Sequence, residues 1–167
     1  MIFVTVGTHE QPFNRLIGAI DELVEDGRIT EDVVVQYGYS TYKAPHCKSW
    51  QFIPYQQMWN LVKEARIVIT HGGPSSFIMS LQMGKIPIVV PRQAKFDEHV
   101  NDHQLIFAKE VARRKRNIVV LEDINKLEDT ISSYDEICQT LNGKLESNNI
   151  QFNHKFAKIV DELLTKN

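Results

Sequence analysis

The sequence has 167 residues, of which 43% are hydrophobic and 24% charged, and its formal net charge is −2. These values are typical of one globular domain that is long enough to bury a core. The nearly balanced charge argues against nucleic acid or an anionic membrane surface as a direct partner. Cys47 and Cys138 form no CxxC motif and the N-terminus lacks the basic start of a secretion signal, so we expect reduced thiols in a cytoplasmic protein.

Strand and helix patterns alternate along the chain. Short β-branched runs predict strands, and apolar residues at helical spacing predict helices between them. The expected strands are 2–6, 33–37, 50–53, 66–70, 86–90 and 118–121, and the expected helices are 12–24, 54–65, 75–83, 99–113 and 125–131. The alternation favours an α/β fold, a Rossmann-like parallel sheet with helices on both faces.

The C-terminal part of the chain has a weaker pattern. We expect a Rossmann-like domain over residues 1–131, a linker with a short helix over 132–149, and an amphipathic helix over 150–167. The apolar face of that last helix carries Phe152, Phe156, Ile159, Val160 and Leu163. This face can pack on the sheet of its own chain or dock a partner.

One turn between a strand and a helix has an unusual composition, His71-Gly72-Gly73-Pro74-Ser75-Ser76. Parallel sheets bind ligands beyond the carboxyl ends of their strands, and the free N–H groups of a helix N-terminus attract anions. The two glycines would let a diphosphate approach the backbone. Ser75 and Ser76 either bind a phosphate oxygen or simply cap the helix. The turn matches neither GxGxxG nor the Walker motif.

The first strand ends in a similar way. Gly7 and Thr8 follow it and can offer N–H groups to the same phosphates from another side. His9 and Glu10 come next and are candidates for acid–base chemistry. The alternative is that both are polar loop residues beside a helix.

A third loop, PRQAKFDEHVNDHQ at residues 91–104, is dense in hydrogen-bonding side chains. Such a loop suits a polyhydroxyl ligand, although acidic residues also favour a helix N-terminus without any ligand. His99 and His103 are spaced to share one helix face. Val100 stands where the HExxH zinc motif requires glutamate, so we do not expect a metal site.

Three segments together carry a resemblance. FVTVGTHEQPFNRLI, ITHGGPSS…GKIPIVVP and PRQAKFDEHVNDHQ, in this order, resemble the C-terminal-domain family of family-28 glycosyltransferases. More narrowly, the chain is similar to single-domain bacterial enzymes of capsule and exopolysaccharide synthesis, and to the catalytic subunit of the bipartite UDP-GlcNAc transferase of asparagine-linked glycosylation. The resemblance covers roughly residues 1–131.

The resemblance implies an architecture and an activity. The chain would be the C-terminal half of a GT-B fold that binds a UDP-sugar, with galactose in β-1,4 linkage as our choice. A membrane-associated partner subunit would supply the other half, bind the lipid-diphosphate-linked acceptor, and recruit the chain to the inner face of the membrane. A second copy of the chain could stand in for the partner. Transfer would be inverting and would need no cofactor or metal, because helix and loop amides stabilise the leaving diphosphate.

The resemblance also implies roles for individual residues. The nucleotide would be bound by Gly7, Thr8, His71, Gly72, Gly73, Ser75 and Ser76, and the donor sugar by Arg92, Glu98, His99, Asn101, Asp102 and Gln104. Glu10 and His9 are the local candidates for the catalytic base, and the uracil would lie near the loop after Tyr37 and the turn at residues 53–57. One position departs from the family, because Met79 stands where many relatives carry a glutamate that holds the ribose hydroxyls.

Two other functions compete with this one. The chain could be a non-catalytic activator of a partner glycosyltransferase, but an activator would need neither the phosphate turn nor the polar loop. A nucleotide hydrolase ranks last, because the sequence has no Walker lysine and no cluster of metal-binding carboxylates.

Overall fold

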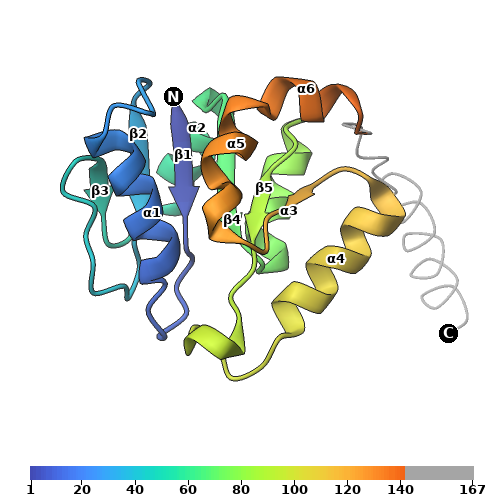
Figure 1. The fold of residues 1–167 in the computed structure, drawn as a ribbon, viewed down its shortest axis with the longest axis horizontal. Coiled ribbons are helices and arrows are strands. Elements are labelled where there is room, and N and C mark those ends of the chain that lie inside the picture. The colour runs from blue at the N-terminus through green and yellow to red at the C-terminus, as the bar shows by residue number, and fades with distance from the viewer. Residues whose placement is uncertain (142–167) are drawn as a thin grey trace, which may run out of the picture.

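The computed structural model describes residues 1–141, and it contains a parallel sheet (Figure 1). The strands are β1 (Ile2–Thr5), β2 (Val33–Gln36), β3 (Lys48–Trp50), β4 (Ile67–His71), β5 (Ile88–Val90) and β6 (Val119–Val120). They are ordered β3-β2-β1-β4-β5-β6, and every neighbouring pair is parallel. This is the doubly wound order of Rossmann folds, so the predicted fold class is confirmed.

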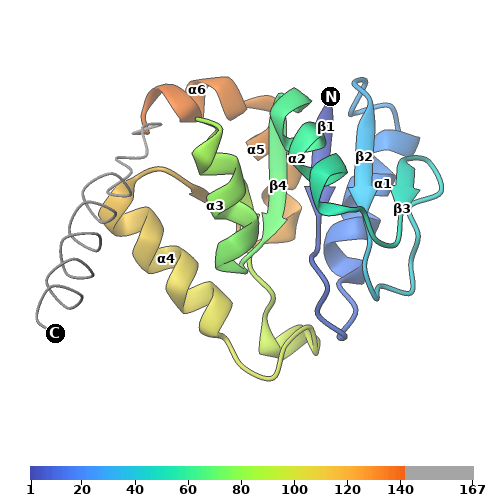
Figure 2. The same ribbon diagram turned by 180° about the vertical axis from the view of Figure 1, so that it is seen from behind.

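Helices cover both faces of the sheet. They are α1 (Asn14–Glu25), α2 (Tyr55–Glu64), α3 (Pro74–Gln82), α4 (His103–Lys115), α5 (Leu127–Ser132) and α6 (Tyr134–Gln139), with short 3-10 turns η1 (Ala94–Phe96) and η2 (Ile124–Lys126). Figure 1 shows α1 and α5 in front of the sheet, and Figure 2 shows α2 and α3 on the opposite side.

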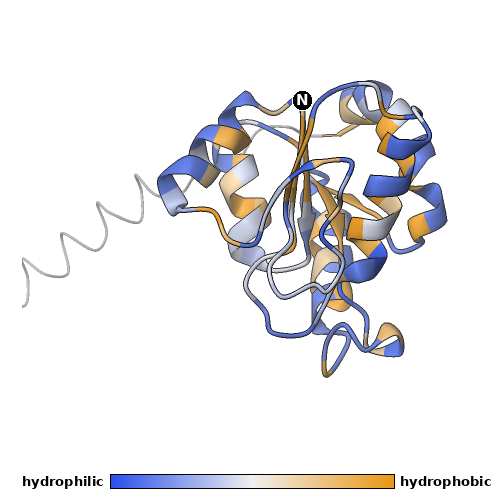
Figure 3. Ribbon diagram, turned by 90° about the vertical axis from the view of Figure 1, so that its left-hand side faces the viewer, coloured by the Kyte–Doolittle hydropathy of each residue, from blue (hydrophilic) through white to orange (hydrophobic). Residues whose placement is uncertain are grey.

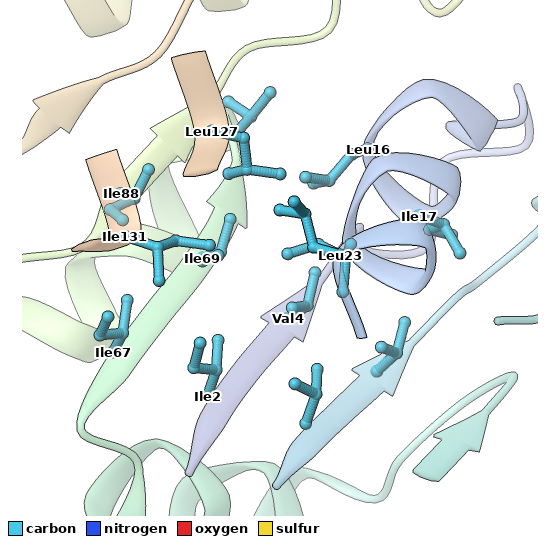
Figure 4. Close-up of a cluster of buried hydrophobic side chains, with 14 of the residues drawn as sticks. Ile2, Val4, Leu16, Ile17, Leu23, Ile67, Ile69, Ile88, Leu127 and Ile131 are labelled. Carbon is cyan, nitrogen blue, oxygen red and sulfur yellow. The ribbon is translucent and has the colours of Figure 1, made fainter. Parts of the chain in front are cut away.

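The alternation of side chains along each strand builds two core layers. Val4 and Ile69 point to the side of α1 and α5, where they join the largest buried cluster (Figure 4). Phe3 and Val68 point to the other side and pack with Val62 of α2. Both layers exclude water from the strands, which is why the strands read as nearly continuous apolar runs. Figure 3 shows this hydrophobic interior between helices with hydrophilic outer faces.

Helix α4 starts four residues later than the periodicity predicts. The backbone turns at Asp97, which has a left-handed φ of 56°, and Asn101 accepts a hydrogen bond from the backbone N–H of His103 at 3.1 Å. Asp102 accepts one from the N–H of Ala94 at 2.8 Å. Such bonds from side chain to backbone compete with helix formation. His99 therefore lies outside α4, and the expectation that it shares a helix face with His103 is wrong.

The described core extends beyond residue 131. Tyr134 in α6 is buried, and its hydroxyl donates a hydrogen bond to the carbonyl of Ile86 at 2.6 Å. β3 also differs from expectation, since it pairs with β2 from Lys48 to Trp50 rather than from 50 to 53. The predicted amphipathic helix at 150–167 lies outside the described residues. Over residues 1–141, every helix is too short or too polar to cross a bilayer.

Candidate functional site

The strand order predicts a candidate ligand site between β1 and β4. From β1 the chain winds outward to β2 and β3, and it then returns to β4 on the other side of β1. Connections that leave in opposite directions open a crevice at the carboxyl ends of these two strands. The structure has a cavity of about 250 Å³ there. Its lining residues are Thr5, Gly7, Thr8, Tyr55, Met58, His71, Ser75, Ser76 and Met79.

Helix α3 begins at this cavity with no side-chain cap. Gly73 is the N-cap residue and Pro74 occupies the first turn, with no side chain bonded to the turn's N–H groups. Among the described residues no side chain caps this turn, so the expected alternative in which Ser75 or Ser76 caps the helix does not occur. The N-terminal end of the helix dipole therefore faces the cavity, where an anion would be stabilised.

The glycines around the cavity give room to His71 and Gln104. A Cβ atom on Gly73 would lie 2.4 Å from Nε2 of His71, and one on Gly7, whose φ is +74°, would lie 2.5 Å from Cε1 of the same ring. A Cβ atom on Gly72 would lie 2.7 Å from Cβ of Gln104. Close packing inside the protein thus requires these glycines before any ligand is considered.

His71 is held as a neutral imidazole at the end of β4. Burial, together with the positive charge of Arg92, lowers its pKa to about 4. Its Nδ1 lies 3.4 Å from Oγ of Ser76. A neutral ring can both donate and accept a hydrogen bond, so His71 orients the serine beside the first turn of α3.

Gln36 fixes the loop that follows β1, a role that the sequence analysis missed. Its Oε1 accepts hydrogen bonds from the hydroxyl of Thr5 at 2.6 Å and from the N–H of Gly7 at 3.1 Å. Its Nε2 donates to the carbonyl of Gly7 at 2.8 Å. The sequence signal for this role was a polar residue, Gln36, at the end of a strand that otherwise consists of β-branched valines.

Arg92 joins the first loop to the third. Its side chain is fully buried and donates to the carbonyls of Gln11 at 2.7 Å and Val6 at 3.1 Å. It also donates to the carbonyl of Glu98 at 3.1 Å and lies 4.7 Å from the ring centroid of Phe13. Burial lowers the pKa of Arg92 to about 10, which leaves it charged at neutral pH.

Glu98 is also turned inward. It is 3% exposed, and its two carboxylate oxygens accept hydrogen bonds from Arg15, each at 2.8 Å. One of them also accepts from the N–H of Gln93 at 3.1 Å. Arg92 and Glu98 were expected to contact the donor sugar, but the structure places them beneath the loops. We assign them to positioning, because both carboxylate oxygens of Glu98 and the two terminal nitrogens of Arg92 bond to protein groups, whereas Nε of Arg92 is buried without a partner among the described residues.

Two histidines from different loops meet above this network. The rings of His9 and His99 stack with centroids 4.7 Å apart and an angle of 19° between their planes. The Nε2 of His9 also lies 2.8 Å from Oε1 of Gln11. Burial and the charges of His9 and Arg92 lower the pKa of His99. This pair brings the first and third loops together, whereas Glu10 is exposed.

The structure therefore gathers part of the predicted set. Gly7, Thr8, His71, Ser75 and Ser76 line one cavity. The remaining residues lie on the neighbouring third loop or on the turn itself, namely Gly72, Gly73, His99, Asn101, Asp102 and Gln104. Tyr55 falls within the turn predicted to meet the uracil. Met58 and Thr5 were not predicted to line the site. Met58 belongs to the apolar pattern of a helix and Thr5 to that of a strand, and neither pattern distinguishes a cavity-lining residue from a core residue.

Known proteins match this chain at two levels, a family model and distant solved structures. A search of curated proteins found no match. Among solved structures, the chain is similar to the glycosyltransferase SnogD from Streptomyces nogalater, with 15% identity over 72% of this chain and 31% of that one, at a TM-score of 0.48. The glycotransferase of kitacinnamycin has 13% identity over 83% of this chain and 37% of its own, at a TM-score of 0.46.

The chain thus spans about a third of the length of these two solved structures. A family model gives the more specific result. The model described as the glycosyltransferase family 28 C-terminal domain matches residues 1–163, which is nearly the whole chain. The chain therefore belongs to the glycosyltransferase family 28 C-terminal domain family.

Proposed function

We propose that this chain binds the UDP-sugar donor of an inverting glycosyltransferase. The observation that carries the proposal is the uncapped first turn of α3, which faces the cavity at the reversal of strand order. A diphosphate there is stabilised by the positive end of the helix dipole and accepts hydrogen bonds from the hydroxyls of Ser75 and Ser76. Thr8 contacts it from the first loop. Membership of the family supports the same assignment.

The chemistry follows from stabilisation of the leaving group. An acceptor hydroxyl attacks the anomeric carbon of the donor sugar, the bond from that carbon to the diphosphate oxygen breaks, and the hydroxyl proton passes to a general base. The α3 N-terminus stabilises the negative charge that develops on the departing diphosphate, a task that other enzymes give to a metal. His9 and Glu10 are the proposed bases on this chain.

The third loop is the proposed contact for the donor sugar. His99, Asn101, Asp102 and Gln104 remain candidates, because they lie on the loop that His99 brings against the first loop. Arg92 and Glu98 act beneath them by fixing the backbone. Galactose in β-1,4 linkage, transferred to a lipid-diphosphate-linked sugar in capsule or exopolysaccharide synthesis, is the specific reaction that we propose.

A second polypeptide is part of this proposal. The family model is a C-terminal domain, which supports a complementary half that binds the acceptor. We propose that this half is membrane-associated and brings the chain to the inner face of the membrane. A second copy of the chain is the alternative partner.

Calorimetric titration with UDP tests the donor site. The full chain is expected to bind UDP, and Ser75→Asp is expected to weaken binding by at least about tenfold, because a carboxylate repels phosphate but suits a helix N-terminus. Ser75→Asn, its uncharged counterpart, should lose markedly less. If the folded Ser75→Asp variant bound UDP like the wild type, the phosphate site would lie elsewhere.

A further inference from the structure

The cavity at the reversal of strand order has two unlike walls. The polar wall consists of Thr8, His71, Ser75 and Ser76, and the apolar wall consists of Tyr55, Met58 and Met79. Among the described residues that line it, none has a carboxylate or an amide side chain. This composition suits a ligand that carries charge at one end and makes apolar contacts at the other.

Helix geometry places Met79, part of the apolar wall, about one helical turn beyond the proposed phosphate site. Met79 follows Ser75 by four residues in α3, so both side chains lie on the same face of the helix. Four residues correspond to a rise of about 6 Å along the helix axis. In a nucleoside diphosphate, the group directly joined to the phosphates is the ribose. A diphosphate on the first turn of α3 would therefore bring the ribose to the level of Met79.

A second methionine faces the same place from another helix. Met58 in α2 packs in the same apolar cluster as Met79, and both are partly buried. Tyr55, one turn before Met58, is 67% exposed and offers an aromatic face further out. A thioether sulfur is a weak hydrogen-bond acceptor, so these methionines cannot satisfy a ribose diol as a carboxylate does.

This difference affects which nucleotides the site accepts. Many dinucleotide sites bind the ribose 2′-hydroxyl through an aspartate or a glutamate. A site built to bond a hydroxyl rejects an analogue without it, because buried polar groups are then left unpaired, whereas an apolar surface discriminates weakly. Met58 and Met79 have no such group to leave unpaired, and the hydroxyl of Tyr55 belongs to a side chain that is 67% exposed.

We propose that Met58 and Met79 hold the sugar ring of the nucleotide by apolar contact, so that the site accepts a ribonucleoside diphosphate and its 2′-deoxy form alike. The proposal rests on the proposed function and deepens it, since it defines the class of donor nucleotide. Discrimination among donors then comes from the base and from the transferred sugar.

The first test compares two nucleotides on the full wild-type chain. UDP and 2′-deoxyuridine 5′-diphosphate are titrated by calorimetry, and their dissociation constants are expected to agree within about threefold. A loss of more than about tenfold for the deoxy form would overturn the inference while leaving the proposed donor site intact. If neither nucleotide bound, the proposed function itself would fail, and the inference with it.

The second test introduces the missing acceptor. Met79→Glu is expected to favour UDP over the deoxy form by at least about tenfold, and Met79→Leu is expected to keep the two equal. The ratio is the readout because repulsion between the new carboxylate and the phosphates affects both nucleotides equally. If the glutamate variant does not fold, Met79→Gln offers an amide at the same place. A folded variant that binds both nucleotides equally would show that residue 79 does not face the ribose.

Discussion

His71 is the residue around which the proposed site is arranged. Its ring lies where Cβ atoms of Gly7 and Gly73 would otherwise stand, and its Nδ1 approaches the hydroxyl of Ser76. The sequence analysis attributed the glycine pair to clearance for a ligand. The structure shows that the fold itself requires glycine at positions 7 and 73, because the His71 imidazole fills the space that a side chain would occupy there.

The fit around His71 predicts the effect of a single methyl group. Gly73→Ala is expected to reduce the free energy of unfolding by about 1–3 kcal/mol, because the ring is confined between two glycines and cannot move away. Gly18→Ala is the matched control, since a Cβ atom there meets nothing within 4 Å. It should gain about 0.5–1 kcal/mol in helix α1. Urea denaturation measures both, and equal stabilities for the two variants would contradict the packing described.

The lowered pKa of His71 predicts loss of stability in acid. Between its usual value of 6.5 and its folded value of about 4, the unfolded chain binds more protons than the folded one, so stability falls as pH falls. The loss amounts to at most about 3 kcal/mol. His71→Asn should flatten the stability curve between these two pH values. A variant whose unfolding free energy still fell as steeply as that of the wild type would refute this.

His46 provides a control of opposite sign. Its hydrogen bond to Asp21 raises its pKa, so its contribution is fully present below the unfolded pKa and is lost as pH rises through the folded value. His46→Asn should therefore destabilise the protein more at pH 5 than at pH 8. Denaturation at the two pH values distinguishes the two histidines.

At the scale of elements, two loops are joined beneath the site by buried ionic groups. Arg92 donates to carbonyls of the first loop, and Glu98 binds Arg15 of α1. Arg92 is fully buried and the side chain of Arg15 is 12% exposed, and both loops reach the same end of the sheet (Figure 1). The loops are therefore one unit in which a change beneath the surface alters the spacing of His9 and His99.

This arrangement predicts different outcomes for two arginine-to-lysine changes. Arg92→Lys should weaken UDP binding by about tenfold, because a single ammonium group cannot reach carbonyls on both sides of the loop. Arg15→Lys should change UDP binding by less than about threefold, because its bonds go to Glu98 and to the carbonyl of Pro91. Calorimetry on variants with confirmed folding is the measurement. Equal losses would mean that Arg92 does not position the first loop in particular.

The elements themselves were largely predictable, whereas the interior of the third loop was not. Hydrophobic periodicity reports which residues are apolar, and the strands and helices follow from it. It does not report that Asn101 and Asp102 bond to the backbone and delay α4. Nor does it distinguish polar side chains that face a ligand from Arg92, which bonds to backbone carbonyls, and Glu98, which bonds to Arg15 and to the N–H of Gln93. Those outcomes depend on contacts between residues far apart in sequence.

For the whole molecule, the strand order determines where a ligand can bind. The crevice lies at the reversal between β1 and β4, and five of the seven residues predicted for the nucleotide line it, namely Gly7, Thr8, His71, Ser75 and Ser76. Other cavities exist among the described residues. One of about 500 Å³ lies between α3 and α4 and includes Phe107, and one of about 340 Å³ lies between α1 and α5 and includes Arg28. The first of these includes Gly72 and Pro74 at the start of α3, but neither cavity is lined by the loop that follows β1.

A crystal structure of the full chain with UDP tests the central claim most directly. The account predicts that the diphosphate lies on the first turn of α3, within hydrogen-bonding distance of Ser75 or Ser76, and that the ribose lies against Met79. UDP bound in the cavity beside Phe107 or in the one beside Arg28, with the crevice between β1 and β4 unoccupied, would contradict it.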